Sequence, residues 1–231
     1  MPLPLINSIA SWILKQRIHQ IELFIKYPME VQEELLFGLL KSAENTVLGK
    51  KYDYSSIKNY QTFNERIPVS TYEELEPFIE QTRQGAQNIF WNSTIKYFAK
   101  SSGTTNAKSK FIPVSSEALE NNHYKASKDL LCMYLNNNED SQLFTGKSLR
   151  LGGSKELYEN NNTFFGDLSA ILIDNMPMWA EFSSTPSNKT SLMSNWETKL
   201  PAIIKESSLE NVTSLAGVPS WMMVLLNKTL E

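Results

Sequence analysis

The first part of the chain carries apolar residues at the spacing of amphipathic helices. Over residues 5–26, apolar positions recur every three or four residues, and Pro28 follows this run. Residues 30–48 repeat the same spacing, with an apolar stripe that ends before Gly49. Because one face of each segment is apolar, both are predicted to pack as helices, with Gly49 as the C-terminal cap of the second.

A third helix is predicted to begin at Thr71. Thr71 and Glu74 fit a capping box, in which each side chain accepts a hydrogen bond from the other residue's backbone N–H. Pro77 lies inside the pattern and is expected to kink this helix or delay its start. Residues 1–90 are therefore predicted to form a helical lead-in without chemistry of its own.

After residue 90 the pattern changes to strands that alternate with helices. Strand-like runs occupy residues 93–100, 110–114, 148–153 and 211–217. Helices are predicted at 116–136, at 192–207 and from Pro219 onward, and 166–176 reads as helical or mixed. The Asn-rich stretches 136–141 and 159–163 are predicted to be solvent-exposed loops. This order predicts an α/β fold, in which N-terminal helices precede a largely parallel sheet flanked by helices.

The organisation along the chain points to one incomplete domain. The pattern stops within the last predicted helix, with no closing strand or cap. Residues 1–231 are therefore expected to be a partial N-terminal domain of a larger protein. Within it, residues 91–231 would be the α/β core that follows the helical lead-in, since no linker or repeat separates them.

Composition and charge narrow the possible partners. Twenty-two Lys and Arg residues stand against 25 Asp and Glu residues, giving a net charge of −3, so no basic surface for nucleic acid or anionic lipid is indicated. The N-terminal residues lack the basic segment of a signal peptide. No stretch approaches the ~20 apolar residues of a membrane span. A cytoplasmic protein without nucleic-acid or membrane partners is predicted.

Cysteine and histidine are scarce. Cys132 is the only cysteine, which excludes an intramolecular disulfide and a Cys-rich zinc site within these residues. It lies in an apolar, helix-like stretch and is predicted to be inert core. His19 and His123 are the only histidines, too few for a metal cluster. No protein metal site is predicted.

The stretch with candidate chemistry is "SSGTTNAKSK" at residues 101–110, between two strand-like runs. Gly103 allows a sharp turn that brings backbone N–H groups toward a ligand. Its candidate phosphate-binding residues are the hydroxyl-bearing and basic positions around that glycine: Ser101, Ser102, Thr104, Thr105, Lys108 and Lys110. Such a loop neutralises a polyphosphate without a large basic surface. From composition alone, a merely polar surface loop explains the stretch equally well.

Two other motifs fail on spacing. A Walker A loop ending at residues 107–109 would require glycines where Ser102 and Ala107 stand. A nucleophile elbow at residues 152–156 would require glycine where Glu156 stands, so a serine hydrolase is not supported.

Residues 98–115 resemble the first signature of adenylate-forming enzymes, which include acyl-CoA synthetases, nonribosomal adenylation domains and luciferases. The longer spacing to Lys110 resembles more narrowly the auxin-responsive, or Gretchen Hagen, family of acyl-acid amido synthetases and its bacterial relatives. Further matches follow the same order as in that family, at residues 67–80, 151–154, 166–172 and 215–222. The resemblance thus extends over almost the whole chain.

This resemblance implies an ATP-dependent ligase. Such enzymes join ATP and a small carboxylic acid as an acyl-adenylate, and the amine of an amino-acid acceptor then attacks the activated acyl group. Mg²⁺ commonly bridges the phosphates. Residues 101–105 would surround the β- and γ-phosphates, and Lys110 would take the place of the signature lysine, with Lys108 as the second candidate. No protein nucleophile is required, so no catalytic side chain is assigned; positioning and charge stabilisation would carry the reaction.

The resemblance also suggests an acid-binding half. His123 and Tyr124 lie on the helix after the loop, where the family builds part of the acyl pocket, and Gly217, Val218 and Pro219 would line its floor. A solvent-facing helix for the first pair and an ordinary strand-to-helix turn for the second remain alternatives. An arginine that plant relatives often use is not evident near His123, which disfavours a plant-hormone substrate.

Two other functions stay open. A non-catalytic binding or scaffold protein would retain the fold, and an acyl-CoA synthetase would transfer the acyl group to a thiol. The family's later signatures, which hold adenine and ribose, have no counterpart in these residues, so this chain alone is expected to be inactive.

Overall fold

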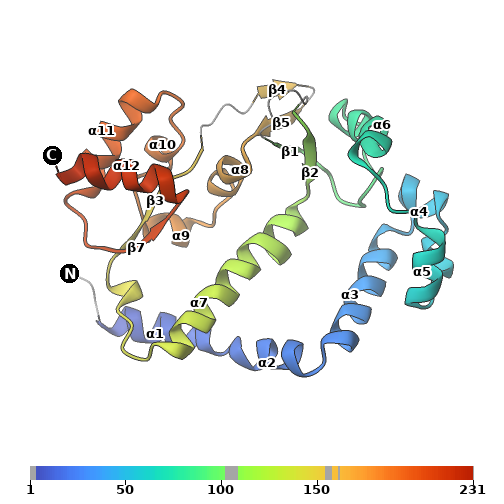
Figure 1. Ribbon diagram of the computed structural model, residues 1–231, viewed down its shortest axis with the longest axis horizontal. Helices are drawn as coiled ribbons and strands as arrows, with labels where there is room; N and C mark the ends of the chain where they lie inside the picture. The colour runs from blue at the N-terminus through green and yellow to red at the C-terminus, as the bar shows by residue number, and fades with distance from the viewer. Residues whose placement is uncertain (1–3, 102–108, 154–157, 161, 231) are drawn as a thin grey trace. The chain divides into compact units, whose positions relative to one another are not determined.

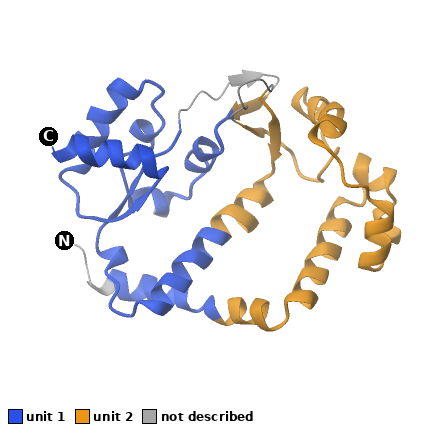
Figure 2. Ribbon diagram, viewed as in Figure 1, with its two compact units in different colours: residues 1–18, 126–157, 166–231 blue, residues 19–125, 158–165 orange. Residues whose placement is uncertain are grey.

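The computed structural model describes residues 4–101, 109–153, 158–160 and 162–230 (Figure 1). The chain forms two compact units, coloured in Figure 2. Unit 1 comprises residues 1–18, 126–157 and 166–231, and unit 2 comprises residues 19–125 and 158–165.

The regular elements described before residue 97 are all helices, as the periodicity predicts. They are α1 (Pro4–Lys15), α2 (Ile18–Lys26), α3 (Pro28–Ala43), α4 (Val47–Lys51), the 3₁₀ turn η1 (Tyr54–Ser56), α5 (Tyr60–Arg66) and α6 (Tyr72–Arg83). The helix predicted over 5–26 is divided into α1 and α2. The Arg17 N–H donates to the Leu14 carbonyl at 3.0 Å, a tighter turn that ends the α-helical pattern of α1.

The predicted role of Gly49 as a helix cap is wrong. Gly49 lies inside α4, and its N–H donates to Oγ1 of Thr46, the N-cap residue, at 2.9 Å. A Cβ at this position would lie 2.0 Å from the Ala43 carbonyl oxygen. Glycine is needed here because two backbone segments approach closely, not because a helix ends.

The capping box at the start of α6 is confirmed. The Glu74 N–H donates to Oγ1 of Thr71 at 3.3 Å, and the Thr71 N–H donates to Oε2 of Glu74 at 2.7 Å. The helix begins at Tyr72 and continues past Pro77, so the proline does not delay its start. The cap therefore fixes where the first turn of α6 lies.

Unit 2 contains a four-stranded sheet in the order β2-β1-β5-β4. Its strands are β1 (Tyr97–Lys100), β2 (Phe111–Val114), β4 (Tyr158–Asn160) and β5 (Thr163–Gly166), the last residue of which falls in unit 1. β1 pairs with β2 and β4 with β5, both antiparallel. The solvent loop predicted at 159–163 is wrong, because this stretch is mostly a hairpin. Asn162 has a φ of 61°, a conformation that asparagine adopts more readily than most residues.

Aromatic side chains hold this sheet against α6. Phe98 is fully buried and packs with Ile79 of α6 and Phe165 of β5. The guanidinium of Arg83, the last residue of α6, lies 3.9 Å from the ring centroid of Phe111. The sheet and the helix thus share one core.

Unit 1 contains a parallel sheet in the order β6-β3-β7. Its strands are β3 (Lys147–Arg150), β6 (Ser184–Thr185) and β7 (Val212–Ala216). Its helices after residue 166 are α8 (Leu168–Asp174), α9 (Met178–Phe182), α10 (Asn188–Ser191), α11 (Trp196–Ser207) and α12 (Pro219–Leu230). The α/β prediction is confirmed. The parallel sheet is the one in unit 1, whereas the paired strands β1 and β2 beside residues 101–110 run antiparallel.

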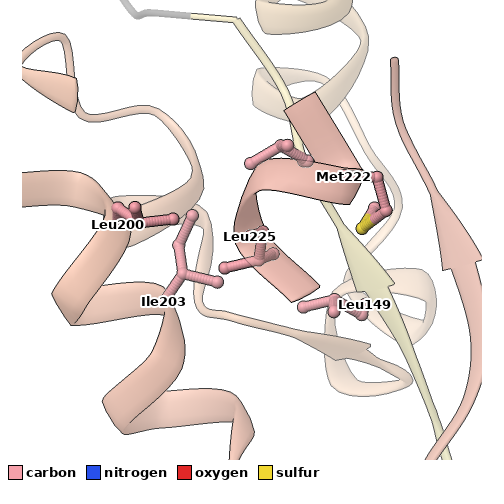
Figure 3. Close-up of a cluster of buried hydrophobic side chains, with 6 residues drawn as sticks. Leu149, Leu200, Ile203, Met222 and Leu225 are labelled. Carbon is pink, nitrogen blue, oxygen red and sulfur yellow. The ribbon is translucent and has the colours of Figure 1, made fainter. Parts of the chain in front are cut away.

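The core of unit 1 lies between β3 and the two helices α11 and α12 (Figure 3). Leu149 of β3 contacts a cluster to which α11 contributes Ile203 and α12 contributes Leu225. Ile203 and Leu225 are 0% and 1% exposed. Burying one such side chain contributes about 1.5–3 kcal/mol, so this cluster is what fixes α11 and α12 on the sheet.

The long helix after β2 joins the two units. It begins with a π-type segment, η2 (Ala118–Tyr124), and continues as α7 (Lys125–Asn137), followed by the 3₁₀ turn η3 (Leu143–Thr145). Cys132 on α7 is fully buried, and burial raises the pKa of its thiol, so its predicted place in the core is confirmed. Among the helices of the described segments, none is long and apolar enough to cross a bilayer.

Candidate functional site

The two ends of the hydroxyl-rich stretch are tied together in unit 2. Lys100 of β1 faces Phe111 of β2 in the antiparallel register. One residue further, the Ser101 N–H donates to the Lys110 carbonyl at 2.8 Å, and the Lys110 N–H donates to Oγ of Ser101 at 3.2 Å. This pair of hydrogen bonds extends the hairpin and sets the distance that residues 102–109 must span. A serine hydroxyl that accepts a bond keeps its own hydrogen for a further acceptor.

The side chain of Lys110 rests against the first turn of α6. Its Nζ lies 3.1 Å from Oε1 of Glu73 and 4.9 Å from the ring centroid of Tyr72. The Tyr72 hydroxyl in turn accepts a hydrogen bond from the Phe111 N–H at 2.9 Å. The capped start of α6 therefore orients both the hairpin and its lysine.

The ion pair between Lys110 and Glu73 is exposed to solvent, so another anion can replace Glu73 beside the ammonium group. The two side chains are 41% and 67% exposed, and water screens such pairs strongly. The pKa of Glu73 is lowered, first by a hydrogen bond from its own backbone N–H and then by Lys110. A more highly charged anion, such as a polyphosphate, can compete with one exposed carboxylate for the ammonium group.

The remaining predicted loop residues stay predictions. Ser102, Gly103, Thr104, Thr105 and Lys108 lie outside the described residues.

Metal ions in proteins are bound by His, Cys, Asp and Glu side chains that lie close together. Within the described segments, no group of three or more His, Cys, Asp or Glu side chains could hold a metal ion. Mg²⁺ is usually bound by one or two carboxylates together with substrate phosphates and waters, so a preformed protein cage is not its normal site. Phosphate binding at the hairpin and Mg²⁺ both stay predictions.

His123 and Tyr124 lie at the end of the π-type segment, in the same unit as Ser101 and Lys110. Both are half-buried. Burial raises the pKa of Tyr124 to about 12, and negative charge on Tyr97 of β1 adds to the shift. The phenol of Tyr124 is therefore held neutral near the strand that leads to Ser101, as a hydrogen-bonding group and not a base.

In unit 1, the predicted pocket-floor residues lie at the carboxyl edge of the parallel sheet. Gly217 follows β7, and Pro219 is the first residue of α12, with Val218 55% exposed between them. The Leu151 N–H donates to the Ala216 carbonyl at 2.9 Å. A Cβ at Gly217 would lie 2.9 Å from Cβ of Leu151. Residues 151–153 and 215–219 therefore meet at the carboxyl edge of the sheet, the edge where open α/β sheets bind ligands.

Sequence analysis missed Lys199 at this edge. Lys199 lies on α11 and is only 3% exposed, and its Nζ donates to the carbonyl oxygens of Gly152 and Gly153 at 2.8 and 3.4 Å. The sequence carries a signal for it. Lys199 stands three positions after Trp196 and four before Ile203, so a charged residue lies on the apolar face of its helix.

The structure thus groups the predicted residues into two sets. Ser101, Lys110, His123 and Tyr124 belong to unit 2, and residues 217–219 belong to unit 1.

Comparisons with known proteins identify the family of the chain. A family model described as the GH3 family N-terminal domain matches residues 17–230. Indole-3-acetic acid-amido synthetase GH3.2 of Arabidopsis thaliana is 34% identical over 101 residues, which are 43% of this chain and 18% of that protein. Jasmonoyl–L-amino acid synthetase JAR6 of Nicotiana attenuata is 31% identical over 104 residues, 45% of this chain and 18% of that protein.

A solved structure shares the fold. The GH3.15 acyl acid amido synthetase superposes with a TM-score of 0.77 at 19% identity, over 93% of this chain and 38% of that one. The chain therefore spans well under two thirds of the length of the relatives that it matches. The family model covers nearly all of its residues, and the chain belongs to the GH3 family.

Proposed function

We propose that this chain is the N-terminal portion of an ATP-dependent ligase that activates a small carboxylic acid as an acyl-adenylate and conjugates it to an amino acid. The observation that carries the proposal is the hydrogen-bonded base of the hairpin at Ser101 and Lys110, in a chain of the GH3 family. Two relatives are named as an indole-3-acetic acid-amido synthetase and a jasmonoyl–L-amino acid synthetase.

In unit 2, the hairpin would bind the terminal phosphates of ATP. Residues 101–105 would supply hydroxyl and backbone N–H donors, and Lys110 would exchange Glu73 for a phosphate oxygen. Lys108 would add a second positive charge. Mg²⁺, when bound, would supply charge neutralisation between phosphates.

In unit 1, the turns at 151–153 and 217–219 would contact the acid. Gly217 leaves no room for a side chain against Leu151, so the two turns keep a fixed spacing. In unit 2, the family resemblance makes His123 and Tyr124 further candidates for contact with the acid. The neutral phenol of Tyr124 would donate a hydrogen bond without repelling a carboxylate.

The chemistry follows from activation of an electrophile. A free carboxylate is a poor acyl donor because its oxygen leaves badly. The carboxylate oxygen attacks the α-phosphorus of ATP, pyrophosphate leaves, and the acyl-adenylate forms. The amino-acid amine then attacks the acyl carbon, its nitrogen loses a proton to solvent, AMP leaves with the electron pair of the C–O bond, and an amide remains. The protein's task is to align these groups and offset the charge that develops on the phosphates.

The test is acid-dependent ATP–pyrophosphate exchange by the complete protein, with a panel of carboxylic acids. Lys110→Ala and Thr104→Ala should each lower exchange at least ~10-fold, equivalent to ~1.4 kcal/mol of transition-state stabilisation. Lys50→Ala, at an exposed lysine of α4 in the same unit, is the matched control and should leave exchange unchanged. Unchanged rates in both site variants would remove these residues from the site.

The molecule that accepts the acyl group distinguishes the competing functions. Amide products with amino acids would support the proposal, whereas thioester formation with CoA would assign the protein to acyl-CoA synthetases. No exchange with any acid would favour a non-catalytic binding protein that retains the fold.

A further inference from the structure

Lys199 is a buried cation among apolar side chains. Its neighbours in the chain, Trp196 and Leu200, pack in the core of unit 1, and Lys199 itself is 3% exposed. Removing an ammonium group from water costs several kcal/mol unless its hydrogens are bonded. A methionine or leucine at this position would pack in the core without that cost. The lysine must therefore do something that an apolar side chain would not.

What the lysine does in the structure is hold a turn. Its Nζ donates to the carbonyl oxygens of Gly152 and Gly153, the residues that follow β3 at the carboxyl edge of the parallel sheet. Carbonyl groups that end a strand would otherwise need water or other donors. One ammonium group binds two successive carbonyls, and so fixes the orientation of both peptide planes.

The other side of the same turn is held by α8 and the residue before it. The Gly153 N–H donates to Oγ of Ser169 at 3.0 Å. A Cβ on Gly153 would lie 2.5 Å from Oδ2 of Asp167, so this carboxylate packs directly against the glycine backbone. The negative charge of Asp167 favours the ammonium form of Lys199, although burial has the larger effect and lowers its pKa. The turn is thus bound on its carbonyl side by Lys199 and on its N–H side by Ser169.

The turn is also in contact with the predicted pocket floor. Leu151, the residue before Gly152, bonds through its N–H to Ala216 and packs within van der Waals distance of Gly217. A shift of residues 151–153 would therefore displace residues 217–219. No other described residue donates a side-chain hydrogen bond to both Gly152 and Gly153.

We propose that Lys199 is a positioning residue, which binds the Gly152 and Gly153 carbonyls and so holds the 151–153 and 217–219 turns in the shape that receives the carboxylic acid. The inference rests on the proposed function for the identity of the ligand. The arrangement of the turn itself does not depend on it.

The first experiment measures steady-state kinetics of the complete protein with Lys199→Met. The acid should bind less well, with its KM raised at least about 10-fold, while the KM for ATP changes less than about twofold, because the hairpin lies in the other unit. Lys199→Arg keeps a charge and two donors and should recover part of the loss. Lys205→Met, at an exposed lysine of the same helix, is the control and should behave as wild type.

A second experiment does not need activity. Hydrogen–deuterium exchange of the complete protein should become faster in peptides that cover residues 148–153 and 212–219 in Lys199→Met, and stay unchanged in peptides from unit 2. If Lys199→Met does not fold, Ser169→Ala releases the same turn from its exposed side and should give the same pattern more weakly.

The outcomes separate the two proposals. In Lys199→Met, unchanged hydrogen–deuterium exchange at both turns would overturn the positioning role. An equal rise in the KM values for acid and ATP would overturn it as well. Faster hydrogen–deuterium exchange at both turns in Lys199→Met would support the positioning role even if the wild-type protein showed no adenylation activity. That absence of activity in the wild type would reject the proposed function.

Discussion

Arg17 and Asp129 are joined by two hydrogen bonds in unit 1. Nε of Arg17 lies 2.6 Å from Oδ1 of Asp129, and Nη2 lies 3.2 Å from Oδ2. The side chains are 18% and 22% exposed, and this contact raises the pKa of Arg17. The pair connects the residue between α1 and α2 to α7, over more than 100 positions of sequence.

This geometry predicts a measurable coupling. A double-mutant cycle with Arg17→Met and Asp129→Asn should give a coupling energy of about 1–2 kcal/mol in urea unfolding, since the pair is bidentate and mostly shielded. The pair Arg66–Asp53, at 3.5 Å with Asp53 62% exposed, is the control and should show a smaller coupling. Equal couplings for the two pairs would contradict this reading.

Glu73 should restrain the lysine of the hairpin. In Glu73→Gln, the ammonium of Lys110 loses its neighbouring negative charge, so its attraction for phosphate increases. The KM for ATP should fall by about two- to fivefold in exchange assays of the complete protein. Glu76→Gln, at an exposed position of the same helix, is the control. A raised KM in Glu73→Gln would show that Glu73 instead orients Lys110 for binding.

Two glycines should respond to alanine in opposite directions. Gly217→Ala would place a Cβ 2.9 Å from Cβ of Leu151 and 3.2 Å from Cε of Met222, and should destabilise the protein by about 1–3 kcal/mol. Gly38→Ala, in the middle of α3 with nothing within 4 Å of the new Cβ, should stabilise it by about 0.5–1 kcal/mol. Urea unfolding measures both. A neutral Gly217→Ala would show that the two turns adjust independently.

The raised pKa of Tyr124 predicts that the folded protein becomes less stable at high pH. Its pKa is raised from 10.0 to about 12, first by burial. Above pH 10 the unfolded chain loses this proton while the folded chain keeps it, so the free energy of unfolding should fall between pH 10.0 and about 12.

The measurement is an alkaline titration of phenolate absorbance in wild type and Tyr124→Phe. Their difference should show one group that titrates near 12 in the folded protein, and near 10 in denaturant. A difference that titrates near 10 in both conditions would mean that the phenol is solvated.

Local sequence signals located many elements. The capping box at Thr71 and the proline at the start of α12 depend on neighbouring residues alone, and both are found where they were predicted. The class of fold followed from the alternation of strands and helices after residue 90. In each case the controlling interactions lie within a few positions of one another.

Signals that depend on distant partners were missed. Nothing next to Lys199 in the sequence shows that its ammonium meets carbonyls 46 and 47 positions away. The error at Gly49 has a local cause: the apolar pattern does not show that α3 ends at Ala43, so that the chain turns back and Gly49 meets the Ala43 carbonyl six positions earlier. The Asn-rich stretch at 159–163 has the polar composition of a solvent loop. Its composition does not show that Asn162, with its positive φ, lies between two paired strands.

The tie between Ser101 and Lys110 has a consequence for which substitutions the hairpin tolerates. The two bonds use the main chain of both residues and the Ser101 hydroxyl, so the side chain of Lys110 takes no part in closing the hairpin. A substitution of that side chain can therefore change the charge beside the hairpin while the hydrogen bonds that close it are kept.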